Sequence, residues 1–159
     1  MSREIVDALK PPIDRAFLFI DRFIDTCPDD IWVEKSGGWP VWQQIYHILT
    51  SVDFFISAPG ESGPTPLVSS EEAGLRKVAE TTVAKSDIKS ACQAAKERVE
   101  GYMAGLTDAD LAKRNDGIFE RAKMNMTHAA TLSLLSGHGL YHLGSGDAAL
   151  RNHGIAGMF

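Results

Sequence analysis

Apolar residues recur at intervals of three and four along the long segments of this chain, and this spacing limits the fold more than any other feature. Ile13, Phe17, Ile20 and Ile24 are separated by four, three and four positions, and the segment 88–103 repeats the pattern. Because an α-helix has 3.6 residues per turn, such residues share one face. The long segments do not alternate apolar and polar residues as half-buried strands do. The sequence therefore predicts an all-α fold.

Four segments are long and regular enough to form the helices of a four-helix bundle. Pro11 and Pro12 interrupt the first segment, which predicts either a turn before the main helix or a kink within it. Pro40 suits the first position of the second helix, and Gly154 suits the position just after the fourth. The predicted helices span residues 3–25, 40–57, 86–106 and 127–153.

The connections between these helices differ in length. Residues 58–85 are a long connection for a compact bundle. Such a length becomes understandable if the second and third helices run parallel, because the chain must then return along the whole bundle. Before the fourth helix, we expect a short capped turn at residues 107–113 and a loop or small hairpin at residues 114–125.

Length and composition bound the class of protein. A chain of 159 residues, 44% hydrophobic and 23% charged, fits one globular domain over residues 1–159. Its net charge of −5 argues against a nucleic-acid or anionic-membrane partner, because both need an excess of Lys and Arg. No apolar run has signal-peptide length or the ~20 residues of a membrane span. Cys27 and Cys92 are too few for a disulfide scaffold, so we expect a cytoplasmic protein.

His138 and His142 carry the clearest chemistry in the sequence. They are four residues apart in the predicted fourth helix, so both imidazoles project from one face and can reach one metal ion. Burying an unpaired imidazole costs about 1–3 kcal/mol, and a metal ion would satisfy both rings. The helical wheel puts the pair on the inward face of the helix, in a stripe with Thr131, Leu134, Leu135, Tyr141, Ser145 and Ala149.

Four glycines, Gly137, Gly139, Gly144 and Gly146, surround this histidine pair. Each costs about 1 kcal/mol relative to alanine inside a helix, so their number indicates that space is needed there. Close approach of a neighbouring helix, or room beside a bound ion, would explain them. The alternative is that the helix is broken at this point.

A third ligand is needed, because two imidazoles alone make a weak metal site. An Asp or Glu on a neighbouring helix would serve chemically, but His47 is the better candidate, since it is the only histidine of the second helix. The alternative is that His47 is a partly exposed residue bonded to a neighbouring side chain. His128 lies near the helix start, and His153 lies about 16 Å from His142 along the helix, so neither can join the pair.

Two segments resemble the DinB-like superfamily. Its last helix is similar to GHGLYHLGSGDAALRNHG, residues 137–154, and its second helix to WPVWQQIYHILTSVDFF, residues 39–55. The intervening LTDADLA, residues 106–112, is also similar, and the segments match in order and approximate separation. One departure is that Leu-Gly-Ser follows His142 where the family often has Arg-Gly-Gln, which leaves the histidine pair intact.

This resemblance implies a four-helix bundle of up-down-down-up topology that forms a homodimer. It also implies a divalent-metal site of three histidines with open coordination positions, carried over here onto His47, His138 and His142. Zinc and nickel are the leading candidates for the metal, with iron and manganese as alternatives, since three imidazoles accept all of them. Characterised relatives include thiol-dependent transferases and isomerases that use mycothiol, bacillithiol or glutathione.

Three nitrogen ligands and an open position are typical of a catalytic metal. A coordinated thiol would become a thiolate, the attacking form, near neutral pH. The leading interpretation is therefore a metal-dependent transferase that adds a low-molecular-weight thiol to a small electrophilic substrate. Metal-assisted hydrolysis, with water in place of the thiol, is a second interpretation. A non-catalytic metal-binding or stress-responsive protein is a third.

A general acid or base beside the site would favour an enzyme. Asp53, Glu100, Tyr141 and Ser145 are candidates, although no spacing singles one out. Cys92 lies on the predicted core face of the third helix, which indicates packing rather than nucleophilic chemistry. The other cysteine, at the end of the first helix, could be exposed.

Overall fold

The computed structural model describes residues 2–159, and nearly all of its regular structure is helical. The all-α prediction is confirmed, because the two strands are two residues long and form only a small antiparallel pair. No helix within these residues is both long and apolar enough to cross a membrane. The elements in chain order are α1 (Glu4–Thr26), α2 (Asp29–Val33), β1 (Lys35–Ser36), β2 (Trp39–Pro40), α3 (Val41–Ile56), α4 (Ser70–Ala73), α5 (Lys85–Ala104), α6 (Asp116–Ala122) and α7 (His128–Asn152).

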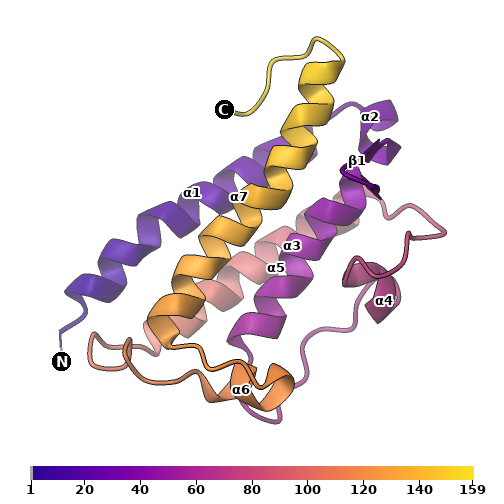
Figure 1. The fold of residues 1–159 in the computed structure, drawn as a ribbon. Coiled ribbons are helices and arrows are strands. Elements are labelled where there is room, and N and C mark those ends of the chain that lie inside the picture. Colours follow the sequence, from indigo (N-terminus) through magenta and orange to yellow (C-terminus); the bar gives the residue numbers. More distant parts are fainter. Residues whose placement is uncertain (1) are drawn as a thin grey trace.

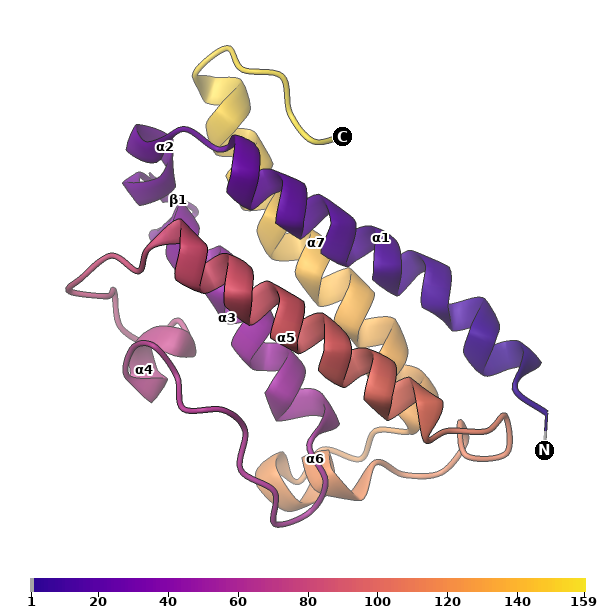
Figure 2. The same ribbon diagram turned by 180° about the vertical axis from the view of Figure 1, so that it is seen from behind.

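Four long helices, α1, α3, α5 and α7, pack side by side and form the body of the molecule (Figures 1 and 2). Both α1 and α3 contact both α5 and α7. Their apolar faces meet in one core, to which each long helix contributes a large, fully buried side chain. Burying such a side chain contributes about 1.5–3 kcal/mol. These four side chains are Phe23, Trp42, Ile88 and Leu143.

Helix α1 runs through Pro11 and Pro12 without ending, so no separate turn precedes it. Each proline removes a backbone hydrogen bond and disfavours the helix by about 3 kcal/mol. Val6 and Ile13, on either side of the prolines, are buried in the core. Both side chains reach the core only if the helix continues across the proline pair. Their burial therefore stabilises the continuous helix and offsets the cost of the two prolines.

Helix α6 corrects the prediction of a loop or hairpin at residues 114–125. The side chain of Asn115 accepts a hydrogen bond from the Ile118 backbone N–H at 3.2 Å and so caps the helix. Ile118 is fully buried. A helix of two turns is too short to show a repeating apolar pattern, which is why periodicity missed it. The start of α5 is also corrected: Ala84, not Ser86, occupies the N-cap position.

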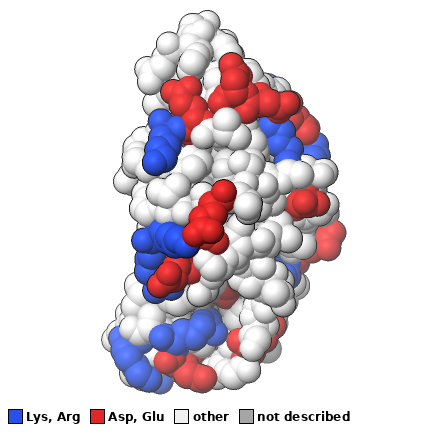
Figure 3. All heavy atoms as spheres, turned by 90° about the vertical axis from the view of Figure 1, so that its right-hand side faces the viewer, with Lys and Arg blue, Asp and Glu red and all other residues white. Residues whose placement is uncertain are grey.

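The connection from α3 to α5 lies on one side of the long helices, to the right in Figure 1, and contains the short helix α4. Figure 3 shows this side of the molecule, where basic and acidic side chains lie next to one another and uncharged surface separates the groups. Within the connection, Lys77 Nζ lies 2.6 Å from Glu80 Oε1. Charges of both signs are present on this side of the molecule.

Candidate metal centre

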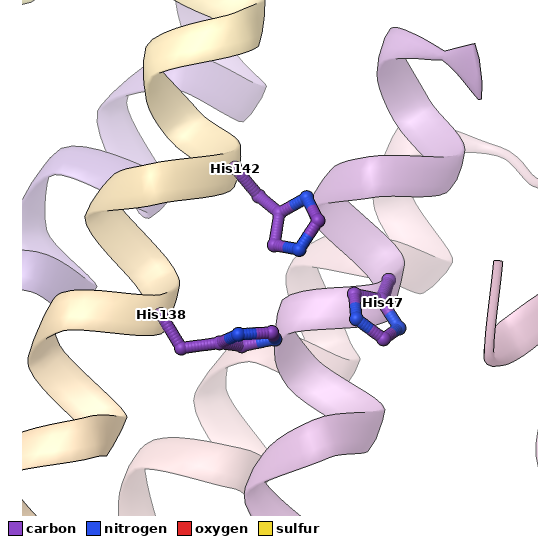
Figure 4. A group of neighbouring side chains, drawn as sticks. All are labelled: His47, His138 and His142. Carbon is purple, nitrogen blue, oxygen red and sulfur yellow. The ribbon is translucent and has the colours of Figure 1, made fainter. Parts of the chain in front are cut away.

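His47, His138 and His142 come together in one cluster between α3 and α7 (Figure 4). The ring centroid of His47 lies 5.1 Å from that of His138 and 4.8 Å from that of His142. The centroids of His138 and His142 are also 4.8 Å apart. One nitrogen atom from each of the three rings lies within 4.8 Å of the other two. The structure thus brings together all three residues that were singled out from the sequence.

Helix α7 places His138 and His142 because it is continuous from His128 to Asn152, and the alternative of a broken helix is therefore wrong. Its glycines have two different environments. A Cβ atom on Gly146 would lie 2.6 Å from Phe23 Cζ, and one on Gly139 would lie 3.5 Å from Ile48 Cγ2. Close approach of α1 explains Gly146, whereas a Cβ atom on Gly139 would make only an ordinary van der Waals contact with α3, so packing does not require a glycine there. A Cβ atom on Gly137 or Gly144 would have no neighbour within 4 Å among residues 2–159, and nothing in the structure explains these two.

His47 is held by the backbone of the neighbouring α4. Its Nδ1 atom lies 2.8 Å from the carbonyl oxygen of Ala73. A carbonyl oxygen can only accept, so Nδ1 carries the ring proton and Nε2 keeps its lone pair. Ser51 Oγ is 3.4 Å from Nε2. The ring is half-buried and its closest hydrogen bond is to a main-chain carbonyl, an arrangement typical of metal-binding histidines.

Two nitrogens of the cluster are buried without a hydrogen-bond partner in the described part of the chain, Nε2 of His138 and Nδ1 of His142. Leaving such atoms unpaired costs about 1–3 kcal/mol each. Burial, with the nearby His47 as a second cause, lowers the pKa of both imidazoles to about 4. Burial also lowers the pKa of His47. All three rings are therefore neutral at pH 7, which is the form that binds a metal ion.

The other two histidines of the chain, His128 and His153, lie outside the cluster, as predicted. His128 Nδ1 lies 2.6 Å from the hydroxyl of Tyr102. His153 Nε2 lies 2.6 Å from a carboxylate oxygen of Glu34, at the far end of α7. Each of these histidines has its own partner elsewhere in the fold.

The helical wheel predicts that Tyr141 lies on the inward stripe with the histidine pair, and this prediction is wrong. Its side chain is 75% exposed, although its ring centroid lies 5.0 Å from that of His142. The stripe drawn from the sequence is wider than the face that α7 buries. Ser145, from the same stripe, lies partly buried and donates a hydrogen bond from Oγ to Ser36 Oγ at 3.0 Å.

The two acidic candidates have partners on other helices. Asp53 Oδ1 forms an ion pair with Arg98 Nη1 at 2.5 Å, on the side of α3 that faces α5. The exposed Glu100 lies 3.8 Å from Lys10 Nζ. Neither carboxylate belongs to the group of residues that could hold a metal ion together.

Both cysteines are buried, which confirms the packing role of Cys92 and corrects the expectation that Cys27 could be exposed. The chain turns into α2 directly after Cys27, and this residue joins the core. Burial raises the pKa of the Cys27 thiol to about 11 and that of Cys92 to about 12. Neither thiol is a nucleophile at neutral pH.

The sequence reasoning missed the Ala73 carbonyl, because a backbone group leaves no mark in a list of side chains. A local signal for α4 was available in the spacing of Ser69 and Glu72. These residues form a capping box, in which each side chain bonds to the other residue's backbone N–H. That signal predicts the short helix, although it does not predict which side chain the helix contacts.

Comparison with protein families supports the resemblance seen in the two histidine-bearing segments. The model of the DinB superfamily matches residues 20–145, which contain His47, His138 and His142. No curated protein and no solved structure matches the chain. The match spans most of the chain, and this protein therefore belongs to the DinB superfamily.

Proposed function

We propose that this protein binds a divalent metal ion through His47, His138 and His142 and uses it to transfer a low-molecular-weight thiol to a small electrophile. The observation that carries the proposal is the cluster of three neutral imidazoles, two of which bury a nitrogen without a partner. Zinc and nickel are the preferred candidates for the ion, and iron and manganese are alternatives, because all four accept imidazole ligands.

The residues of the cluster are suited to this role in different ways. His47 offers its Nε2 lone pair because Ala73 holds the proton on Nδ1. His138 and His142 offer nitrogens that have no competing hydrogen bond within residues 2–159. All three rings are half-buried, so the cluster lies near the surface and not in the centre of the core. When bound, a divalent ion with three neutral ligands keeps its full charge and lowers the pKa of a coordinating thiol.

The state of the chain's own groups favours an external thiol as the nucleophile. Both cysteines are buried and protonated at neutral pH, so neither can attack a substrate. Hydrolysis generally uses a general base for the attacking water, and the two acidic candidates are engaged by Arg98 and Lys10. Thiol transfer is therefore the preferred function, and hydrolysis and non-catalytic metal binding are the alternatives.

Metal analysis tests the first half of the proposal. Protein purified without a histidine tag should contain about one divalent ion per chain by elemental analysis, since the three ligands form one site. His142→Ala should lose that ion. His153→Ala is the matched control. His153 lies at the end of the same helix but contacts Glu34, so its removal should leave the ion in place. Full metal occupancy in a triple variant without His47, His138 and His142 would refute the site.

An activity panel tests the second half. Glutathione, bacillithiol and mycothiol are each incubated with chlorinated and epoxide electrophiles, with the metal-loaded protein, the metal-free protein and His142→Ala. We expect loss of free thiol and formation of a thioether only with the loaded wild-type protein. A metal-loaded protein without any metal-dependent rate across the panel would favour the non-catalytic alternative.

We also propose the up-down-down-up order of the long helices that the family resemblance implies. Lys85 Nζ, at the start of α5, lies 2.6 Å from Asp29 Oδ1 and bonds to the Cys27 carbonyl, so α5 begins where α1 has just ended. In Figures 1 and 2, α3 also begins at this end and α7 ends there.

A homodimer and a cytoplasmic location remain predictions of the proposal. Sedimentation velocity tests the dimer, and cell fractionation tests the location.

A further inference from the structure

We propose that Gln43 is a positioning residue of the metal centre: it fastens the segment 69–80 to α3, so that the Ala73 carbonyl keeps His47 in the tautomer that presents Nε2. This inference rests on the proposed metal function. It concerns residues outside the histidine cluster, and it assigns a purpose to the short helix α4 and to a fully buried amide.

Ala73 connects His47 to a small element that needs external support. Ala73 is the last residue of α4, a helix of four residues. A single helical turn is not stable by itself in water, so its place depends on contacts with the rest of the protein. Besides the bond to His47, the Ala73 carbonyl lies 3.5 Å from Thr50 Oγ1. Both of these partners are on α3, and neither holds the rest of the segment.

Gln43 supplies the attachment. It lies four residues before His47 on α3, and its side chain is completely buried. Its Nε2 donates to the carbonyl oxygens of Glu72 at 2.8 Å and Lys77 at 2.7 Å. Its Oε1 accepts from the backbone N–H of Ala79 at 3.0 Å. The amide thus holds the segment at three points, one of them the carbonyl next to that of Ala73.

The segment also closes on itself, so that it moves as a unit. Glu72 Oε2 accepts from the backbone N–H of Ser69 at 3.0 Å, and Glu72 Oε1 accepts from that of Glu80 at 3.1 Å. One carboxylate therefore ties together the two ends of residues 69–80. Because the segment is internally bonded, fixing it at Gln43 also fixes the position of the Ala73 carbonyl.

The consequence for the metal centre follows from histidine chemistry. A neutral imidazole carries one proton, and the hydrogen bond of one nitrogen decides which nitrogen is free to bind a metal. In Figure 4, the His47 ring lies beside those of His138 and His142. Its Nδ1 donates a hydrogen bond to the Ala73 carbonyl. If the carbonyl moves away, the proton distributes over both nitrogens, and an Nε2–H ring cannot ligate through Nε2.

The neighbouring Gln44 offers a matched control. It is 4% exposed, and its Nε2 donates to the carbonyl oxygens of Ser36 at 2.7 Å and Trp39 at 3.2 Å, in the β1–β2 hairpin. Gln43→Met and Gln44→Met each remove a buried amide and keep the side-chain length. Both should lower the stability of the protein, but only Gln43→Met releases the segment 69–80.

The test has two readouts, neither of which is enzyme activity. The first is the ¹⁵N NMR signal pattern of the His47 ring in metal-free protein, which distinguishes the Nδ1–H from the Nε2–H tautomer. The second is the affinity for zinc by competition with a chelating dye. We expect the wild-type protein and Gln44→Met to keep the Nδ1–H form. Gln43→Met should show a mixture of tautomers and a zinc affinity lowered about ten- to hundredfold.

Two results would overturn the inference: an unchanged His47 tautomer in Gln43→Met, or an equal shift in both variants, which would indicate general loosening. If Gln43→Met does not fold, Ala79→Pro removes one of the three attachments at a loop position and should shift the tautomer in the same direction by less. A wild-type protein that binds none of zinc, nickel, iron and manganese would refute the proposed function. The tautomer measurement would still decide this inference, because it needs no metal.

Discussion

At the scale of single residues, the histidine cluster is costly to the metal-free protein. His138 and His142 each bury a ring nitrogen that no group within residues 2–159 pairs with. An unpaired buried polar atom lowers stability by about 1–3 kcal/mol, whereas an apolar group of similar shape in the same place does not. Sites of this kind are places where stability is lost for the sake of function.

His138→Leu should therefore make the metal-free protein more stable while weakening metal binding. Leucine is similar in size, and it removes one unpaired nitrogen from the cluster. We expect the free energy of unfolding in urea, measured with a chelator present, to rise by about 1 kcal/mol. Zinc affinity should fall strongly. A variant that is less stable than the wild-type protein under these conditions would show that the nitrogen has a partner in solution.

His128 should make stability depend on pH. Burial lowers its pKa, and its place at the first position of α7 opposes a positive charge there. Its folded pKa lies below the unfolded value of about 6.5, so the unfolded chain takes up the proton first as the pH falls. The contribution of His128 is complete above pH 6.5 and is lost below it.

His128→Gln provides the measurement for this effect. Between pH 7 and pH 5, the free energy of unfolding of the wild-type protein should decrease, and it should decrease less steeply in the variant. The cluster histidines also contribute to the slope, but they are present in both proteins, so the difference reports on His128 alone. Equal slopes would mean that the pKa of this ring is the same in the folded and unfolded states.

At the scale of elements, α7 both carries the histidine pair and packs closely against α1. It carries the histidine pair on its α3 side, and Gly146 lets it approach α1 closely enough that a Cβ would lie 2.6 Å from Phe23 Cζ. Gly137, on the same helix, has open space where a Cβ would be, within the described residues. The helix therefore contains one glycine that packing requires and another that it does not.

Gly146→Ala and Gly137→Ala should change stability in opposite directions. The first forces a methyl group against a rigid aromatic ring, and such overpacking lowers the free energy of unfolding by about 1–3 kcal/mol. The second improves helix propensity without a clash and should raise the free energy of unfolding by about 0.5–1 kcal/mol. Urea denaturation measures this free energy for both variants. The packing explanation of Gly146 fails if its replacement is as well tolerated as that of Gly137.

At the scale of the whole molecule, the cluster joins two long helices that are distant in the chain. His47 comes from α3, the other two histidines come from α7, and the Ala73 carbonyl ties α4 to the same site. An ion bound there would link all three elements. Because the unfolded chain does not assemble these ligands, binding energy would appear as folding stability.

Zinc should accordingly stabilise the wild-type fold. At a free zinc concentration a thousand times the dissociation constant, the free energy of unfolding should rise by about 4 kcal/mol, with a matching increase in Tm. His142→Ala should show little of this increase, and His153→Ala all of it. A similar increase in all three proteins would mean that zinc stabilises the fold at some other place.

Local patterns explain what could be predicted from the sequence. The helical class follows from apolar spacing within single segments, and the pairing of His138 with His142 follows from a separation of one helical turn. His47 could be named as a candidate because it is the only histidine of the second helix, but its place in the site depended mostly on the resemblance to a family, because nothing in its own segment indicates which distant residues it meets. The family assignment itself is confirmed over residues 20–145.

What the sequence determined by itself was the class of fold, the histidine pair and the burial of periodic positions such as Ile20. Only the tertiary structure decided that His47 joins the pair, that Ala73 orients it, that Cys27 is buried and that Tyr141 is exposed. The physical reason is the range of the interactions. Periodicity and capping act within a few residues and leave a mark in the sequence, whereas packing between distant segments, and every contact of a backbone carbonyl, depends on how the whole chain closes.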